Sequence, residues 1–92
     1  MHARATLTSA AAEGARAGAT SGADLRAGIS RATVLVEQNM NGAVVRRVSA
    51  EREVIDGLAV LTVRINAEVP GLGMLGATRV DVEGHALIES VQ

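Results

Sequence analysis

The sequence contains no cysteine, no phenylalanine, no tyrosine and no tryptophan among its 92 residues. Without cysteine the chain cannot form a disulfide, a thiolate zinc site or a thiol nucleophile. Without aromatic rings it lacks the side chains on which nucleic-acid bases stack. Lysine is also absent, so all nine basic residues are arginine, and ten acidic residues bring the net charge to −1. This near-neutral balance argues against nucleic acid as a partner.

The residues that are present predict one small packed domain spanning residues 1–92. Hydrophobic residues make up 48% of the chain and there is a single proline, which excludes collagen-like and disordered chains. Each aromatic side chain would bury about 150–250 Å², so a core made only of aliphatic residues and alanine is thin. We expect no more than a few kcal/mol of stability from such a domain alone.

Residues 3–20 have the pattern of a helix built from small residues, with glycines spaced by four at Gly14, Gly18 and Gly22. Small residues in a row let another backbone approach closely. Each glycine costs about 1 kcal/mol in a helix relative to alanine, so packing must offset that cost. A helix or the sheet of the same domain can fill this groove, and an assembly interface with another molecule is the second possibility; both can hold at different turns of the helix. The residues expected on the face are Ala3, Leu7, Ala10, Ala11, Gly14 and Gly18.

A second amphipathic helix is predicted over residues 23–40. Ser21 and Asp24 fit a loose capping box at its start, and Asn41-Gly42 provides a stop signal at its end. The apolar residues expected on its buried face are Leu25, Ile29, Ala32, Val36 and Met40.

After Gly42 the hydrophobic period changes from helical to alternating, which predicts strands over residues 43–55, 58–69 and 77–89. The first strand is expected to kink near residues 49–51, and Asp56-Gly57 is a two-residue hairpin signal. The order α-α-β-β-β predicts an α+β fold with two helices on one face of a three-stranded antiparallel meander.

Alternation also predicts the register of the last two strands. Residues 59, 61, 63, 65 and 67 of the second strand are expected to point toward the helices, as are residues 80, 82, 86 and 88 of the third. Because opposed residues must share a face, we expect Ile65 to lie opposite Val82 and Arg64 opposite Glu83. The outer face is then an ion-paired polar surface, not a site.

Residues 71–76 spell Gly-x-Gly-x-x-Gly, the pattern of a dinucleotide-binding loop. That function needs a helix after the loop, whereas the sequence predicts a strand, so we expect no nucleotide and no other cofactor. The segment is better explained as a hairpin connection that exposes Leu72, Met74 and Leu75 as a possible contact loop. The alternative is that these three side chains fold back over the open end of the core.

No catalytic or metal-binding constellation is apparent. The only imidazoles are His2, at the terminus, and His85, expected on the outer face of the third strand. A metal site would need further ligands, and no serine has the context of an activated nucleophile. Arg46 and Arg47 are expected to form surface ion pairs, one of them toward the helix side. We expect no enzymatic activity and no small-molecule substrate.

The segment around residues 10–19 (Ala-Ala-Ala-Glu-Gly-Ala-Arg-Ala-Gly-Ala) resembles the start of TadE-like proteins, pilin-like components of the Tad (Flp pilus) machinery of bacteria. The Leu-Thr-Val-Arg strand at residues 61–64, the Pro-Gly-Leu-Gly loop at 70–73 and the final strand ending at 86–89 are also similar. In that family the Glu-Gly-Ala-Arg run closes a long N-terminal helix whose first part spans the membrane.

The resemblance implies a minor pilin or pseudopilin that acts by assembly. Its partners would be other pilin or pilus-assembly proteins, and it would be anchored in the membrane through an N-terminal helix that precedes this sequence. The domain would be exported, either on the membrane or in a surface filament. The alternative function is a freestanding α+β binding or dimerisation module. The abrupt helical start after Met1-His2 is consistent with a truncated longer helix.

Overall fold

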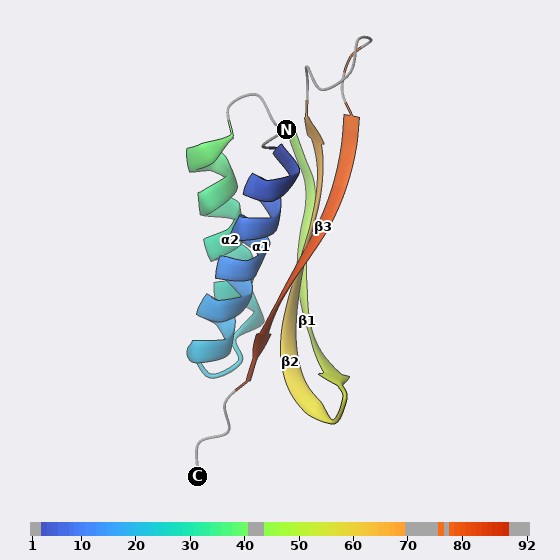
Figure 1. The fold of residues 1–92 in the computed structure, drawn as a ribbon. Helices are drawn as coiled ribbons and strands as arrows, with labels where there is room; N and C mark the ends of the chain where they lie inside the picture. The colour runs from blue at the N-terminus through green and yellow to red at the C-terminus, as the bar shows by residue number, and fades with distance from the viewer. Residues whose placement is uncertain (1–2, 41–43, 70–75, 77, 89–92) are drawn as a thin grey trace.

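The computed structural model describes residues 3–40, 44–69, 76 and 78–88. It confirms the predicted α-α-β-β-β order, with the helices on one side of an antiparallel sheet of strand order β1-β2-β3 (Figure 1). The elements are α1 (Ala3–Thr20), α2 (Leu25–Asn39), β1 (Val44–Ile55), β2 (Leu58–Val69) and β3 (Thr78–Leu87).

The second helix starts at Leu25, two residues later than predicted, because Ala23 is not helical. Its φ is +61°, and the preceding Gly22 has φ +75°, so both residues belong to the turn between the helices. Asp24 is the N-cap, and its carboxylate accepts hydrogen bonds from the backbone N–H groups of Arg26 and Ala27. A capping aspartate satisfies backbone donors that a helix start otherwise leaves unpaired, so Ser21 is not the cap that the sequence suggested.

The buried face of α2 is also rotated slightly from the predicted one. Gly28, Ala32 and Val36 are its buried residues. Ile29, which the pattern placed on that face, is half-buried and does not pack against the buried core. Gly28 takes its place because a residue without a side chain allows α2 to lie close to α1.

The predicted Asp56-Gly57 hairpin is confirmed. Asp56 has φ +53° and Gly57 φ +80°, so both central residues adopt the left-handed conformation of a type I′ turn. This turn matches the right-handed twist of the two strands it connects, which fixes the pairing of Ile55 with Leu58.

The irregularity in β1 lies at Val45–Arg47 and not at residues 49–51. Arg46 is the extra residue of a β-bulge. It pairs with Glu68, on the face of the sheet that the helices leave uncovered, and Arg47 lines the groove on the same face. The bulge therefore brings both arginines to one face, and the expectation that one of them points toward the helices is wrong.

The register of β2 and β3 is the predicted one. Ile65 lies opposite Val82 and Arg64 opposite Glu83. Near the hairpin, Ala59 lies on the predicted inner face but is exposed although it was expected to be covered. The β1–β2 hairpin continues past the ends of the helices (Figure 1), so nothing covers the inner face at this position.

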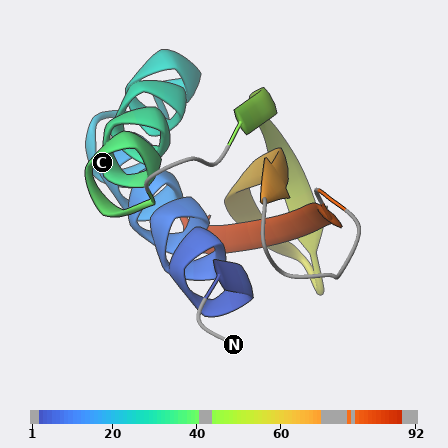
Figure 2. The same cartoon turned by 90° about the horizontal axis from the view of Figure 1, so that it is seen from above.

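The helices form one layer and the sheet the other (Figure 2). Contacts between the layers join α1 mainly to β3 and α2 mainly to β1, and the molecule is long and narrow at 52 × 25 × 18 Å. Its largest fully buried side chains are Leu7, Leu61, Ile65, Val36, Val63 and Thr62. Burying each of the large aliphatic side chains contributes about 1.5–3 kcal/mol, while six alanines fill the space between the helices and the sheet.

Candidate functional site: the uncovered face of the sheet

The small-residue face of α1 is used inside the domain. Leu7, Ala10 and Ala11 are 0–3% exposed, and Gly14 and Gly18 are buried as well. These five residues face α2 and the sheet, so they are not accessible to another molecule. The expected assembly interface on this face is therefore wrong for them, and the intramolecular alternative holds; Ala3 is the first residue of α1.

Close contact between the two helices explains why glycines are needed. A Cβ atom at Gly14 would lie 2.7 Å from the carbonyl oxygen of Gly28 and 2.8 Å from the Cβ atom of Ala32. A Cβ atom at Gly18 would lie 2.8 Å from the carbonyl oxygen of Asp24. Real Cβ atoms are not found this close to backbone, so the helix pair depends on the glycines. Gly22 does not continue the row, because it lies in the turn with φ +75°.

Gly84 in β3 is a key residue that the sequence analysis missed. A Cβ atom here would collide with the backbone of α1, at Ala11 C and at Ala12 N, and would lie 2.6 Å from the Ala11 oxygen. The strand backbone thus lies directly against the helix backbone. The available signal was an isolated glycine inside a strand pattern, which often marks close approach of another backbone.

The opposite, outer face of the sheet is not covered by the helices (Figure 1). Side chains from all three strands meet on this face. At its centre Arg64 on β2 donates to three carboxylates. Its Nε bonds Glu83 at 2.8 Å, its Nη1 bonds Glu51 at 2.6 Å and its Nη2 bonds Glu53 at 3.0 Å. These hydrogen bonds raise the pKa of Arg64, so the guanidinium stays charged. The cluster of one arginine and three glutamates carries a net charge of −2.

Beneath Arg64, Thr62 is fully buried although it lies on the uncovered face. Its hydroxyl donates to Glu53 Oε1 at 2.7 Å. Hydrogen bonds to Glu53 from the Thr62 hydroxyl and from the Arg64 guanidinium lower its pKa to about 2. The carboxylate is therefore ionised at neutral pH, and it can only accept hydrogen bonds.

His85 lies on the outer face, as expected, and takes part in this network. Its Nδ1 lies 2.8 Å from the Thr62 hydroxyl and its Nε2 lies 3.4 Å from Glu83 Oε1. The single hydroxyl proton of Thr62 is already donated to Glu53, so the proton of this second bond must come from His85. The geometry therefore assigns a protonated Nδ1 to His85.

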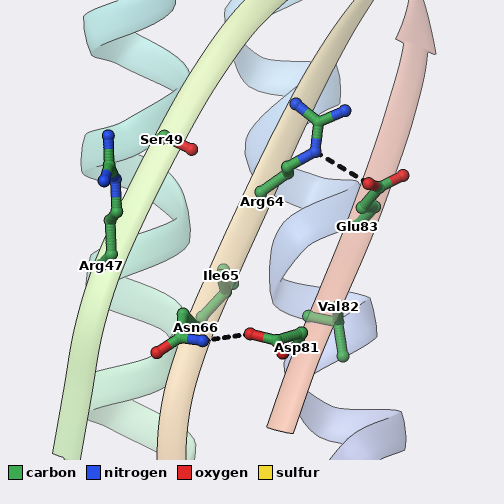
Figure 3. A pocket seen from close by; sticks show the side chains of 8 residues that line it. All are labelled: Arg47, Ser49, Arg64, Ile65, Asn66, Asp81, Val82 and Glu83. Carbon is green, nitrogen blue, oxygen red and sulfur yellow. Dashed lines mark hydrogen bonds and ion pairs between the residues drawn. The ribbon is translucent and has the colours of Figure 1, made fainter.

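Beside the Arg64 cluster, toward the bulge, lies an open groove of about 520 Å³ (Figure 3). Arg47 and Ser49 line it from β1, Arg64 and Asn66 from β2, and Asp81 and Glu83 from β3. The Asn66 amide donates to the Asp81 carboxylate. The Arg47 side chain runs along β1 and ends level with Ser49 (Figure 3).

The distal tip, defined as Ile55, Leu58 and Leu87, is an exposed apolar patch. These side chains are 40%, 54% and 58% exposed. Between them lies a further hollow of about 340 Å³, with the buried Val60 at its base. Val60 was expected to be an outward residue, and the surrounding tip residues and His85 cover it.

Metal binding, membrane insertion and dinucleotide binding are three further possibilities for the described residues. No group of three or more histidine, aspartate or glutamate side chains there could hold a metal ion, and neither helix is long and apolar enough to cross a membrane. Gly76, the last glycine of the Gly-x-Gly-x-x-Gly segment, has φ +105° and is followed by β3. A dinucleotide-binding loop requires a helix at that place. The possible contact loop residues Leu72, Met74 and Leu75, and also His2, lie outside the described residues.

Comparisons with protein-family models, with curated proteins and with solved structures found no match to this chain.

Proposed function

We propose that this chain is the head domain of a non-enzymatic, pilin-like structural component of a Tad/Flp-type pilus or secretion apparatus, which acts by assembly with other pilin or pilus-assembly proteins. The proposal is supported by the TadE-like Glu-Gly-Ala-Arg run at residues 13–16 and by its position in the fold. The run lies in the middle of α1, which extends along the sheet for 18 residues.

The observation that carries the proposal is the direction of α1. Its first turn lies at one end of the elongated molecule, at the same end as the last residue of β2 and the first residue of β3 (Figure 1). A membrane helix preceding residue 3 would continue α1 out of the domain at this end. The distal tip would then be the part of the head farthest from the membrane.

The mode of assembly differs from the one that the sequence suggested. Because α1 packs its small-residue face against α2 and β3, a partner would contact its opposite side, where Glu13 and Arg16 form an exposed ion pair at 2.8 Å. The distal tip offers a second contact area, since exposed apolar patches on small domains mark interaction sites.

The proposal can be tested by deleting the gene in the source organism and complementing it with variants. We expect deletion to abolish surface filaments or secretion, and the native gene to restore them. Leu58→Ser with Leu87→Ser should restore far less than the matched control Val34→Ser, which removes a 40% exposed side chain on α2. Unchanged filaments and secretion after deletion would contradict the proposal and favour the freestanding binding module.

A further inference from the structure

Among the strands that the structure describes, β1 is an outer strand and pairs only with β2. Antiparallel strands alternate between residues that bond their neighbour and residues whose backbone groups point away. The two-residue turn makes Ile55 and Leu58 a bonded pair, so the odd-numbered residues of β1 bond β2. The N–H and C=O groups of the even-numbered residues therefore point to the free edge, at Val48, Ala50, Arg52 and Val54.

The other edge, on β3, is protected differently. By the same alternation the carbonyl of Asp81 points away from β2, and Arg4 Nη1 on α1 donates to this oxygen at 3.1 Å. A side chain that covers an edge carbonyl blocks the addition of another strand. Among the described residues no comparable bond from outside the sheet reaches the free edge of β1.

The free edge of β1 is long and regular enough to pair. Beyond the bulge at Arg46, the register with β2 continues without a shift from Arg47 to Ile55. Helix α2 packs on the covered face of the sheet, mainly against β1. The unpaired N–H and C=O groups of β1 point sideways in the plane of the sheet, so an added strand would lie beside β1 and not under α2.

We propose that two copies of this chain pair their β1 strands antiparallel about a twofold axis at Ala50, forming a continuous six-stranded sheet. Val48 and Arg52 of each copy would exchange backbone hydrogen bonds, as would the two Ala50 residues. This pairing is a property of the domain itself and does not depend on the proposed role in a pilus. An isologous contact of this kind closes on itself as a dimer.

Charge complementarity favours the register with its axis at Ala50. In this register Arg47 of each copy lies opposite Glu53 of the other copy, so two such pairs form. Ser49 of each copy lies opposite Glu51 of the other. In the described part of the chain Arg47 forms no ion pair, and its guanidinium is exposed. Glu53 is ionised at neutral pH because its hydrogen bonds hold its pKa at about 2.

The neighbouring registers are less favourable. An axis at Ser49 would place Arg52 opposite Arg46 of the second copy, at the bulge. An axis at Glu51 would place two glutamates directly opposite each other. Like charges directly opposite each other destabilise a strand pair.

Light scattering coupled to gel filtration tests the pairing, because it gives the molar mass of the 92-residue chain at each of several rising concentrations. We expect a mass of twice 9.4 kDa that dissociates on dilution and with added salt. Arg47→Glu, which places two like-charged pairs across the axis, should raise the dissociation constant by at least about tenfold. A chain that stays monomeric at high micromolar concentration would overturn the proposal.

The absence of cysteine allows the register to be tested separately by single-cysteine variants. Under mild oxidation, Ala50→Cys should cross-link faster than Ser49→Cys, and much faster than Arg79→Cys on the protected β3 edge. Circular dichroism checks that each variant is folded. Equal cross-linking at positions 50 and 79, or a dimer unaffected by Arg47→Glu, would show that another surface pairs.

Discussion

Replacing Gly84 by alanine adds one methyl group at the point where β3 meets α1. The added Cβ atom would collide with the backbone at Ala11 and Ala12. Neither strand nor helix backbone can rotate away as a flexible side chain could, so the two layers must move apart. Overpacking in a core costs about 1–3 kcal/mol. Because the added methyl group meets rigid backbone, we expect Gly84→Ala to lower the free energy of unfolding by about 3 kcal/mol or more.

This loss is large for a domain of 92 residues. Domains of this size lose about 4–8 °C of melting temperature per kcal/mol, so Gly84→Ala should melt about 12–24 °C below the native chain. Far-UV circular dichroism is the suitable signal in thermal and urea unfolding, because the chain has no tryptophan or tyrosine.

Gly28→Ala is the matched control. A Cβ atom at Gly28 would lie 3.2 Å from the Gly14 oxygen and 3.4 Å from Val63 Cγ2, contacts that small shifts relieve. Alanine also gains up to about 1 kcal/mol of helix propensity over glycine, so we expect a change near zero. If Gly84→Ala unfolds at the same urea concentration as Gly28→Ala, the layers are not packed backbone to backbone.

Three further predictions concern the outer face of the sheet. First, the pKa of Glu53 is about 2 in the folded chain, against an ordinary value of 4.5. This difference adds stability that is complete above pH 4.5 and is lost as the pH falls toward 2. Urea unfolding between about pH 6 and pH 2 should therefore show a stability that depends less on pH for Glu53→Gln than for the native chain. Second, Arg64→Ala should lower the urea midpoint more than Arg46→Ala, since Arg64 bonds three carboxylates and Arg46 one; equal midpoints would contradict a central role for Arg64. Third, long-range ¹H–¹⁵N NMR spectra at neutral pH should show a proton on Nδ1 of His85, and a proton on Nε2 alone would contradict the Thr62 hydrogen bonds.

The order of elements and the register of the sheet were predictable because side-chain alternation is strict. Leu61 and Ile65 on β2 and Val80 and Val82 on β3 must share the covered face, and a slip by one residue would expose them all. The turn at residues 56–57 was predictable for a similar reason, since the Asp-Gly pair adopts positive φ easily.

Features that depend on contacts distant in the chain were not predictable in the same way. The bulge at Arg46 has no glycine or proline to mark it. The burial of Thr62 on the uncovered face depends on Arg64, Glu53 and His85, which three different strands bring together. The pattern of small residues in α1 was recognised, but whether α2 or another molecule fills the groove depends on where the fold places Gly28.

The central claim is that this chain is the head of a membrane-anchored structural protein that assembles with other subunits. The most direct measurement is to express the native gene with an epitope tag from its own locus, and to separate membranes, sheared surface material and cytosol. The account predicts the tagged protein in the membrane and surface fractions, joined to a stretch of about 20 apolar residues before α1. A product found only in the cytosol, without such a stretch, would contradict it.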